Sequence, residues 1–314
     1  MKQKIIVIVG PTATGKTKLS IELCKYFNGE VVSGDSMQIY KHMTIGTAKP
    51  SKEEMQGIKH HLIDIVEPWD CFDVAKFKEH AQKAVKEISV SGKLPFLVGG
   101  TGLYINSFID NVNLGSYKAD YEYRAFLEER AKNEGGAVLL EELREVDPVV
   151  ASRLHENDVK RIIRGLEIYK VTGVSQSEHN EKSRLEESPY EPLIIGLNYA
   201  DRQKLYERIN LRVDIMLENG LLQEVKELFE MDLPEKSTAI QAIGYKELRD
   251  YLENGIGLEE AVDKIKQESR RYAKRQLTWF KKDTRINWIN IDEFKDFDQI
   301  FSHCKNMVES FINI

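Results

Sequence analysis

Residues 5–17 read IIVIVGPTATGKT, and this stretch decides the fold. Residues 5–9 are a short apolar run that ends at a glycine, which predicts a buried parallel strand. Residues 10–17 match the pattern G-x-x-x-x-G-K-[S/T], whose glycines let backbone N–H groups surround phosphate oxygens at the start of a helix. Lys16 would neutralise those oxygens, and the Thr17 hydroxyl could bind Mg²⁺. An accidental turn is the weaker alternative, because the flanking strand and helix are those that a phosphate-binding loop (P-loop) requires.

Further strands surround this unit. A second strand at 30–33 leads to Asp35, and a third at 94–98 ends in the glycine-rich segment 99–102. Later apolar segments at 193–197 and 286–291 are consistent with additional strands. Strands that alternate with helices predict a parallel sheet covered on both faces. We therefore expect a three-layer α/β core of the P-loop NTPase type, assembled from distant parts of the chain.

The length of 314 residues predicts about two domains, because one hydrophobic core stops growing efficiently at roughly 250–300 residues. Helical, polar patterns interrupt and follow the strands. We expect three parts: a P-loop core of residues 1–116, 157–200 and 286–292, a helical insertion of 117–156, and a helical C-terminal region of 201–285 and 293–314.

Composition narrows the class of protein. The net charge is −6, so the whole surface is not basic, but residues 264–285 carry nine Lys or Arg against two acids. The three cysteines have no CxxC spacing, which argues against a disulfide framework or a zinc site. The apolar run near the start is too short for a secretory signal. We expect no membrane span and a cytoplasmic location.

Asp35 and Thr101 follow two core strands, so they should face the P-loop at the carboxyl edge of the sheet. The Asp35 carboxylate could be a base or lie near Mg²⁺, although Asp is also a common helix N-cap. Small residues at 99–102 permit the close approach of a ligand, although a plain tight turn is the alternative. We favour one pocket walled by these segments.

Three other features have ordinary alternatives. His60 and His61 lack metal-ligand partners, so we interpret them as packing at the entry to a strand. Arg161 and Arg164 are three residues apart on a predicted helix and could face one anion, or could be a solvated face. The segment QESRRYAKRQLTWFKK (267–282) interleaves aromatic and basic residues. Its cations could bind an RNA backbone. Alternatively, the aromatic residues form a buried stripe and the charges form the solvent-exposed face of the helix.

These observations leave three possibilities: an enzyme that transfers a group from a diphosphate to RNA, an ATP-dependent nucleotide or small-molecule kinase, and a non-catalytic RNA-binding module. The order of motifs favours the first. The chain resembles the bacterial tRNA dimethylallyltransferase family, also called the tRNA isopentenyltransferase or IPP transferase family, in seven segments: GPTATGKT (10–17), SGDSMQIY (33–40), IGTAKP (45–50), HHLID (60–64), LVGGTGLY (97–104), AIGYKE (242–247) and KRQLTWF (274–280).

The resemblance implies transfer of a dimethylallyl group from dimethylallyl diphosphate to N6 of the adenine at position 37 of tRNA, next to the anticodon, in tRNAs that read codons beginning with U. Diphosphate would be released, and the P-loop would hold that leaving group instead of ATP. The expected cofactor is Mg²⁺, and the expected partner is the tRNA anticodon stem-loop. We expect a monomer.

The resemblance also implies roles for individual residues. Asp35, Thr101 and Lys16 would serve catalysis, with Asp35 accepting the N6 proton, and Thr17 would lie at Mg²⁺. Diphosphate would be bound by Gly10, Thr12, Ala13, Thr14, Gly15, Lys16, Thr17 and one of Arg208 and Arg212. The tRNA would be bound by Asp35, Ser36, Met37, Gln38, Thr101, Arg124, Lys160, Arg161, Ile162, Ile163, Arg164, Arg271, Lys274 and Arg275. Lys160 departs from the family pattern, in which glutamine is common.

Overall fold

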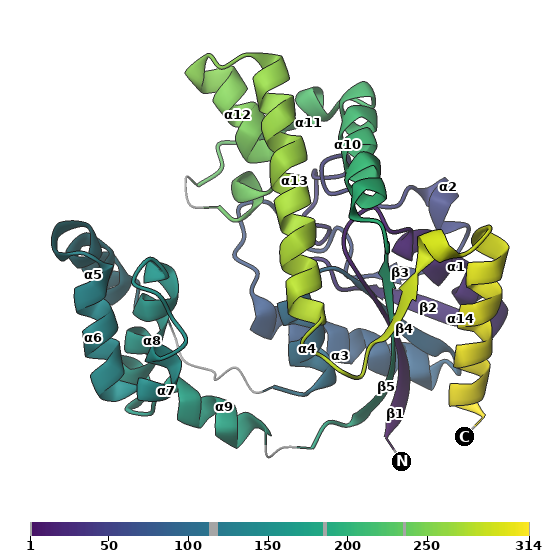
Figure 1. The fold of residues 1–314 in the computed structure, drawn as a ribbon, viewed down its shortest axis with the longest axis horizontal. Coiled ribbons are helices and arrows are strands. Elements are labelled where there is room, and N and C mark those ends of the chain that lie inside the picture. The colour runs from purple at the N-terminus through teal and green to yellow at the C-terminus, as the bar shows by residue number, and fades with distance from the viewer. Residues whose placement is uncertain (1, 113–118, 185–186, 235–236, 314) are drawn as a thin grey trace. The chain divides into compact units, whose positions relative to one another are not determined.

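The structure is a computed structural model that describes residues 2–112, 119–184, 187–234 and 237–313. The chain divides into two compact units. The first comprises Met1–Ile109 and Pro189–Ile314, and the second comprises Asp110–Ser188. Figure 1 shows the path of the chain through both.

The first unit contains a six-stranded sheet in the order β3-β2-β4-β1-β5-β6, with every neighbouring pair parallel. Its strands are β1 (Gln3–Val9), β2 (Gly29–Ser33), β3 (His60–His61), β4 (Leu94–Gly99), β5 (Tyr190–Asn198) and β6 (Asn287–Asn290). The expected parallel α/β core is confirmed. Sequence patterning missed β3 because its two residues are polar and too few to show a period; His60 and His61 form the strand instead of preceding it.

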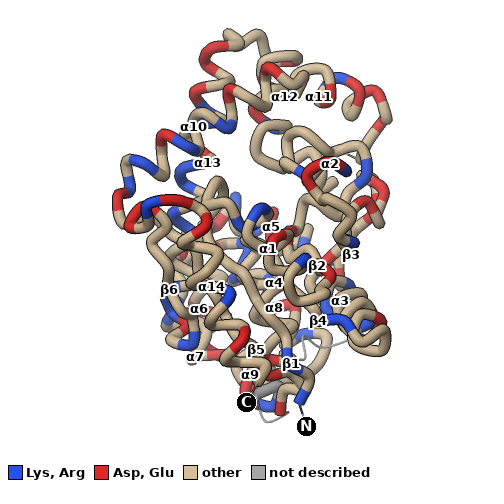
Figure 2. The backbone as a smooth tube through the Cα atoms, turned by 90° about the vertical axis from the view of Figure 1, so that its right-hand side faces the viewer, with Lys and Arg blue, Asp and Glu red and all other residues tan. Residues whose placement is uncertain are grey.

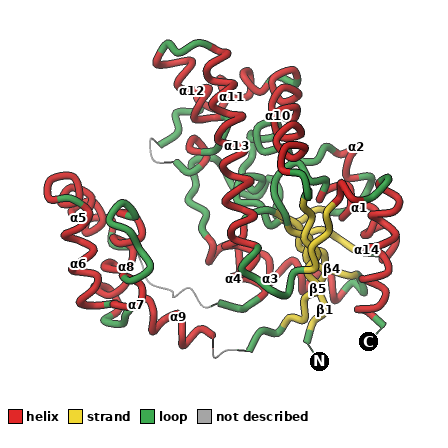
Figure 3. Tube along the Cα trace, viewed as in Figure 1, coloured by secondary structure: helices red, strands yellow, loops and turns green. Residues whose placement is uncertain are grey.

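Helices cover both faces of this sheet (Figure 3). Alternate residues of β1 point to opposite faces, as the pleat of a strand requires. Ile6 and Ile8 pack with residues of α1 (Lys16–Phe27) and α14 (Phe297–Ile312), whereas Ile5, Val7 and Val9 belong to a second core. That core includes α3 (Val74–Val90) and α4 (Gly102–Ile109). The three layers place the P-loop at the carboxyl edge of a strand buried on both sides.

The remaining helices of this unit extend beyond the carboxyl edge of the sheet. They are α2 (Lys52–Met55), α10 (Arg202–Glu218), α11 (Leu221–Phe229), α12 (Tyr245–Asn254) and α13 (Leu258–Phe280), with short 3-10 turns at Ala239–Gln241 and Ile291–Glu293. The sequence predicted a separate C-terminal helical region. The structure instead joins these helices to the sheet unit, because Tyr245, Leu248 and Phe280 share one continuous core with Tyr40 and Val7.

The second unit is a helical bundle: α5 (Tyr121–Glu134), α6 (Gly136–Val146), α7 (Pro148–Ala151), α8 (Val159–Thr172) and α9 (Gln176–Arg184). It is longer than the predicted insertion of 117–156, because α8 belongs to it and not to the P-loop core. Ile162 and Leu166 of α8 pack against Leu127 and Leu143. A side chain at Gly165 would lie 2.7 Å from Leu143, so close helix packing at this point requires glycine.

A buried ion cluster joins α5 to α8. The Glu167 side chain is fully buried and accepts hydrogen bonds from Arg124 Nε and Nη2 at 2.7 and 2.9 Å and from Arg164 Nη1 at 2.7 Å. The backbone N–H of Asp120 donates to the same carboxylate at 2.9 Å. Burial alone would raise the pKa of this carboxyl, but these hydrogen bonds outweigh burial and hold the pKa below its ordinary value.

Replacing Glu167 with glutamine should destabilise the helical unit by about 3 kcal/mol, because two guanidinium groups lose their buried counter-ion. The measurement is hydrogen exchange of the α5 and α8 amides in the full chain. Glu128→Gln, at an exposed position of α5, should change the opening free energy by less than about 0.5 kcal/mol. Equal exchange in the two variants would contradict the assigned role. Since the folded pKa is lowered, the stabilisation is present above the carboxyl's ordinary pKa and is lost as the pH falls through the folded value.

Candidate active site

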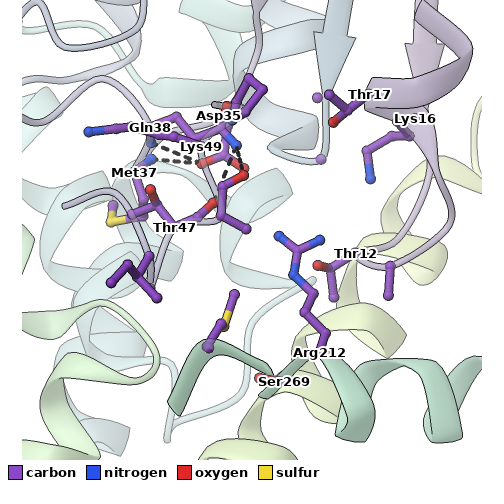
Figure 4. A pocket seen from close by; sticks show the side chains of 18 of the residues that line it. Thr12, Lys16, Thr17, Asp35, Met37, Gln38, Thr47, Lys49, Arg212 and Ser269 are labelled. Atoms are coloured by element: carbon purple, nitrogen blue, oxygen red, sulfur yellow. Dashed lines mark hydrogen bonds between the residues drawn. The ribbon is translucent and has the colours of Figure 1, made fainter. Parts of the chain in front are cut away.

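One cavity of about 1130 Å³ lies at the carboxyl edge of the sheet in the first unit. The loops that follow β1, β2 and β4 line it together with residues of α10 and α13. Of the residues expected to bind diphosphate, the cavity lining includes Thr12, Ala13, Thr14, Gly15, Lys16, Thr17, Arg208 and Arg212, and it also includes Asp35, Ser36, Met37, Gln38 and Arg275. Ligands of parallel α/β sheets bind at this edge. Figure 4 shows the Asp35 turn on one side of the cavity and the P-loop on the other.

The P-loop has the backbone that its glycines predict. Gly10 and Gly15 have φ angles of 141° and 80°, and Ala13 also has a positive φ of 65°. A Cβ atom at Gly10 would lie 2.3 Å from the carbonyl oxygen of Leu197 on β5, so close packing also requires this glycine. The Thr14 hydroxyl donates to the Pro11 carbonyl at 2.9 Å. The Thr14 side chain therefore stabilises the loop itself.

Lys16 is folded against the loop, with Nζ donating to the carbonyls of Gly10 and Pro11 at 3.0 and 2.7 Å. The pKa of Lys16 is lowered to about 7, with burial as the largest cause and the positive charge of Arg212 as the second, while the Asp35 carboxylate opposes the shift. A bound anion would reverse this balance, because negative charge favours the ammonium form. The lysine is thus arranged to become fully charged when a phosphate group enters.

Asp35 caps the turn that follows β2 and also faces the cavity. Its Oδ1 accepts hydrogen bonds from the backbone N–H groups of Met37 at 2.8 Å and Gln38 at 3.3 Å. This oxygen therefore caps a turn and not a helix N-terminus, since the next helix along the chain begins only at Lys52. Asp35 acts electrostatically on Lys16, Arg212 and Tyr272, which places its charge in the same cavity as theirs.

Thr101 lies beside the Asp35 turn and is not among the residues that line the cavity. Its hydroxyl oxygen accepts from the Ser36 backbone N–H at 3.0 Å and donates to the Ser36 hydroxyl at 3.2 Å. The expected direct contact with a ligand is thus replaced by a contact with the turn. Gly99 permits this arrangement, because a Cβ there would lie 2.3 Å from the carbonyl oxygen of Gly34.

Gln276 of α13 connects two walls of the cavity, a role that was not predicted from the sequence. Its Oε1 accepts from the Thr12 backbone N–H at 3.1 Å, and its Nε2 donates to the Gly100 carbonyl at 3.0 Å. A side chain at Gly100 would lie 2.0 Å from this amide, and one at Gly102 would lie 2.2 Å from Trp279. The small residues after β4 therefore admit α13, and Gly99 and Gly100 also line the cavity, as expected. A polar residue within the buried stripe of α13 was the available signal.

Both candidate arginines line the cavity, but Arg212 is the less exposed of the two. It reaches from α10 into the space between the Asp35 turn and the P-loop (Figure 4). Burial lowers the pKa of its guanidinium, and the carboxylates of Asp35 and Glu54 oppose that shift. Arg208 is exposed, and its Nε donates to the Ala13 carbonyl at 3.4 Å. Buried charge beside the P-loop favours Arg212 as the anion ligand.

Three basic residues of α13 that were expected to contact RNA lie on its exposed face. Arg271, Lys274 and Arg275 are exposed, and Figure 2 marks the basic positions of this helix in blue. The Arg275 guanidinium lies 5.7 Å from the centre of the Tyr272 ring. The segment does have a buried stripe and an exposed face, because Phe280 is buried in the core whereas Trp279 is 41% exposed. The RNA contact stays a prediction.

In the helical unit, the expected RNA contacts separate into two groups. Lys160 and Arg161 are exposed, and Arg161 pairs with Asp158 at 3.3 Å. Ile162 and Ile163 are 0% and 4% exposed, so the expectation that their side chains contact tRNA is wrong. They lie on the inner face of α8, which packs against the rest of the bundle. Arg124 and Arg164 are held by Glu167, with part of each side chain exposed.

Few side chains in the cavity could bind Mg²⁺. Among the described residues there is no group of three or more His, Cys, Asp or Glu that could hold a metal. Thr17 and Asp35 contribute oxygen atoms to the cavity. Mg²⁺ commonly binds through one or two protein oxygens plus phosphate oxygens, and these residues fit that pattern.

The fold and the cavity define a P-loop enzyme whose cavity places cations opposite a carboxylate. The family model described as IPP transferase matches residues 38–283, and a second one described as isopentenyl transferase matches residues 3–71. The chain belongs to the IPP transferase family, which confirms the resemblance of its motifs. Members of this family are transferases.

Known relatives cover nearly the whole chain. The tRNA dimethylallyltransferases of Caldanaerobacter subterraneus and Acetivibrio thermocellus are each 50% identical, over 301 and 307 residues, covering 96% and 98% of both chains. A crystal structure of the tRNA isopentenylpyrophosphate transferase from Bacillus halodurans is 47% identical, with a TM-score of 0.74 and coverage of 98% of this chain and 96% of that one. A eukaryotic dimethylallyltransferase, described as acting on tRNA, is 35% identical with a TM-score of 0.76, covering 88% and 70%. In the described part of this chain, none of the helices is long and apolar enough to cross a membrane.

The state of Lys16 gives a prediction for pH. Diphosphate should raise the lysine pKa on binding, so one proton is taken up above pH 7 and the affinity for inorganic diphosphate should fall by up to about tenfold per pH unit. Calorimetric titration across this range measures the effect. Lys16→Arg is the matched control, because guanidinium stays charged and the titration of the ligand is common to both proteins. Parallel pH profiles for the two proteins would refute the coupling.

Proposed function

We propose that this chain transfers a dimethylallyl group from dimethylallyl diphosphate to N6 of the adenine at position 37 of tRNA, next to the anticodon, and releases diphosphate. The observation that carries the proposal is the shared cavity, in which Lys16 and Arg212 face the Asp35 turn. Two cations can stabilise the negative charge of the departing diphosphate, and a carboxylate can accept a proton from the attacking amine. Family membership favours this reaction over ATP-dependent phosphoryl transfer.

In the proposed reaction, N6 attacks C1 of the donor. The N6–C1 bond forms, the bond from C1 to the diphosphate oxygen breaks, and its electron pair leaves with diphosphate. P-loop N–H groups, Lys16 and Arg212 would bind the developing charge, an arrangement that is typically the largest single contribution to catalysis. Mg²⁺ held near Thr17 would supply further positive charge to the diphosphate when it is bound.

Asp35 would orient the acceptor and receive its proton. Oδ1 is engaged by the Met37 and Gln38 N–H groups, so the carboxylate is fixed in position and Oδ2 is the oxygen available to N6. Thr101 would act indirectly, because it holds Ser36 next to this carboxylate. The adenine must leave the anticodon-loop stack to reach this point, at a cost of a few kcal/mol.

The exposed cations would bind the RNA backbone. Arg271, Lys274 and Arg275 form one such group on α13, and Lys160 and Arg161 form another in the helical unit. Cations contribute to RNA affinity mainly by neutralising phosphates. A monomeric state and a cytoplasmic location stay predictions of the sequence.

Incubation of unmodified tRNA with dimethylallyl diphosphate labelled in the prenyl group, or with γ-labelled ATP, tests the reaction class. Label should move from the prenyl donor to RNA, and mass analysis of the digested tRNA should place it on N6 of one adenine. Asp35→Ala should lower turnover by about two to four orders of magnitude with tRNA affinity unchanged. The exposed Asp70→Asn serves as control. Label that moves only from ATP would identify a kinase instead.

The role of α13 is tested by the double variant Arg271→Ala with Arg275→Ala. Loss of two phosphate contacts should weaken tRNA binding and reduce the slope of log affinity against log salt by about 1 to 2. Filter binding at several salt concentrations measures the slope. The pair Lys83→Ala with Lys86→Ala on α3 removes the same charge from exposed positions and should leave the slope unchanged. Identical slopes for the two double variants would show that the basic residues of α13 are only a solvated face and do not bind RNA.

A further inference from the structure

The segment 44–48 lines the cavity through all five of its residues, and a carboxylate from outside the cavity holds it. Glu224 of α11 accepts from three consecutive backbone N–H groups: Thr44 and Ile45 donate to Oε2 at 2.7 and 2.8 Å, and Gly46 donates to Oε1 at 3.0 Å. The Tyr245 hydroxyl donates to Oε1 at 2.6 Å. Four donors therefore converge on one side chain.

This geometry requires a charged group with two acceptor oxygens. Consecutive N–H groups that point into one concavity form an anion site, and a carboxylate satisfies it. Glutamine has nearly the same shape, but its NH₂ group would face an N–H donor in place of one oxygen. The fit is also tight, because a Cβ at Gly46 would lie 2.5 Å from the Tyr245 ring.

Hydrogen bonds connect this segment to the Asp35 turn. Gln38 Nε2 donates to the carbonyls of Thr47 and Ala48, each at 3.2 Å. The backbone N–H of Gln38 donates to Asp35 Oδ1 at 3.3 Å, and its Oε1 accepts from the Ser33 hydroxyl at 3.1 Å. A continuous path therefore runs from Glu224 through residues 44–48 and Gln38 to the carboxylate that faces the P-loop.

We infer that Glu224 is a positioning residue for the transfer reaction: it fixes segment 44–48, and through Gln38 it fixes the Asp35 carboxylate opposite the diphosphate. The inference rests on the proposed function. Glu224 does not line the cavity and acts only through the backbone that it holds. The P-loop is held separately, by the hydrogen bond from the Thr12 N–H to Gln276. Loss of Glu224 should therefore leave the affinity for diphosphate unchanged.

The test compares Glu224→Gln with Glu227→Gln, three residues further along α11, whose carboxylate accepts from Gln223 at 2.9 Å. Glu224→Gln should lower kcat for prenyl transfer by about 10- to 100-fold, with the KM for tRNA and the affinity for inorganic diphosphate within about threefold of the unchanged protein. Hydrogen exchange at the Thr44, Ile45 and Gly46 amides should accelerate, while exchange in α1 should not. Glu227→Gln should match the unchanged protein in every measurement.

Tyr245→Phe provides a milder variant, because it removes one of the four donors and keeps the ring against Gly46. It should lower kcat by about two- to fivefold in the same pattern. An unchanged kcat in Glu224→Gln with faster amide exchange would overturn the inference, as would a loss of diphosphate affinity in proportion to kcat. Absence of prenyl transfer by the unchanged protein would overturn the proposed function instead, so the two failures are distinct.

Discussion

The close approach of backbone segments at the carboxyl edge of the sheet is the constraint on which the site depends. Gly10 lies against the Leu197 carbonyl, and Gly99 lies against Gly34, at distances that exclude any side chain. These contacts bring the loops after β1, β2 and β4 to one edge. A larger residue at either point would separate the loops, and the charges that they present would no longer share one cavity.

This packing places positively charged side chains close together in the cavity. Lys16 and Arg212 are both partly buried, and the pKa of each is lowered, with burial as the largest cause; the charge of Arg212 adds to the shift of Lys16. The Asp35 carboxylate opposes both shifts without abolishing them. An entering diphosphate would supply the missing negative charge, so the same groups that bind it are those whose unfavourable burial it relieves. A neutral ligand would not supply this compensation, so the arrangement of charges favours an anion.

The sequence predicted the parts of the fold that have a local signature. The apolar run before Gly10 and the loop that follows it identify strand, helix and phosphate site, because each depends on neighbouring residues only. The roles of Glu224 and Gln276 were not predicted, since each side chain acts on backbone groups about 180 or more positions away. The polar character of Gln276 within a buried stripe was the one local signal, and it does not name the partner. Ile162 and the domain boundaries were misjudged for the related reason that helix periodicity does not reveal which partner covers the apolar face.

Helix α13 shows how one rigid element can serve both substrates. Gln276 points inward and bonds to Thr12 and Gly100, whereas Arg271 and Lys274 on the same helix are exposed. A helix transmits displacement along its length because its backbone bonds resist bending, so RNA bound to the exposed face would bear directly on the contact with the P-loop. The contact of α13 with the P-loop in turn depends on the glycines at 100 and 102, because a side chain at either position would collide with Gln276 or Trp279.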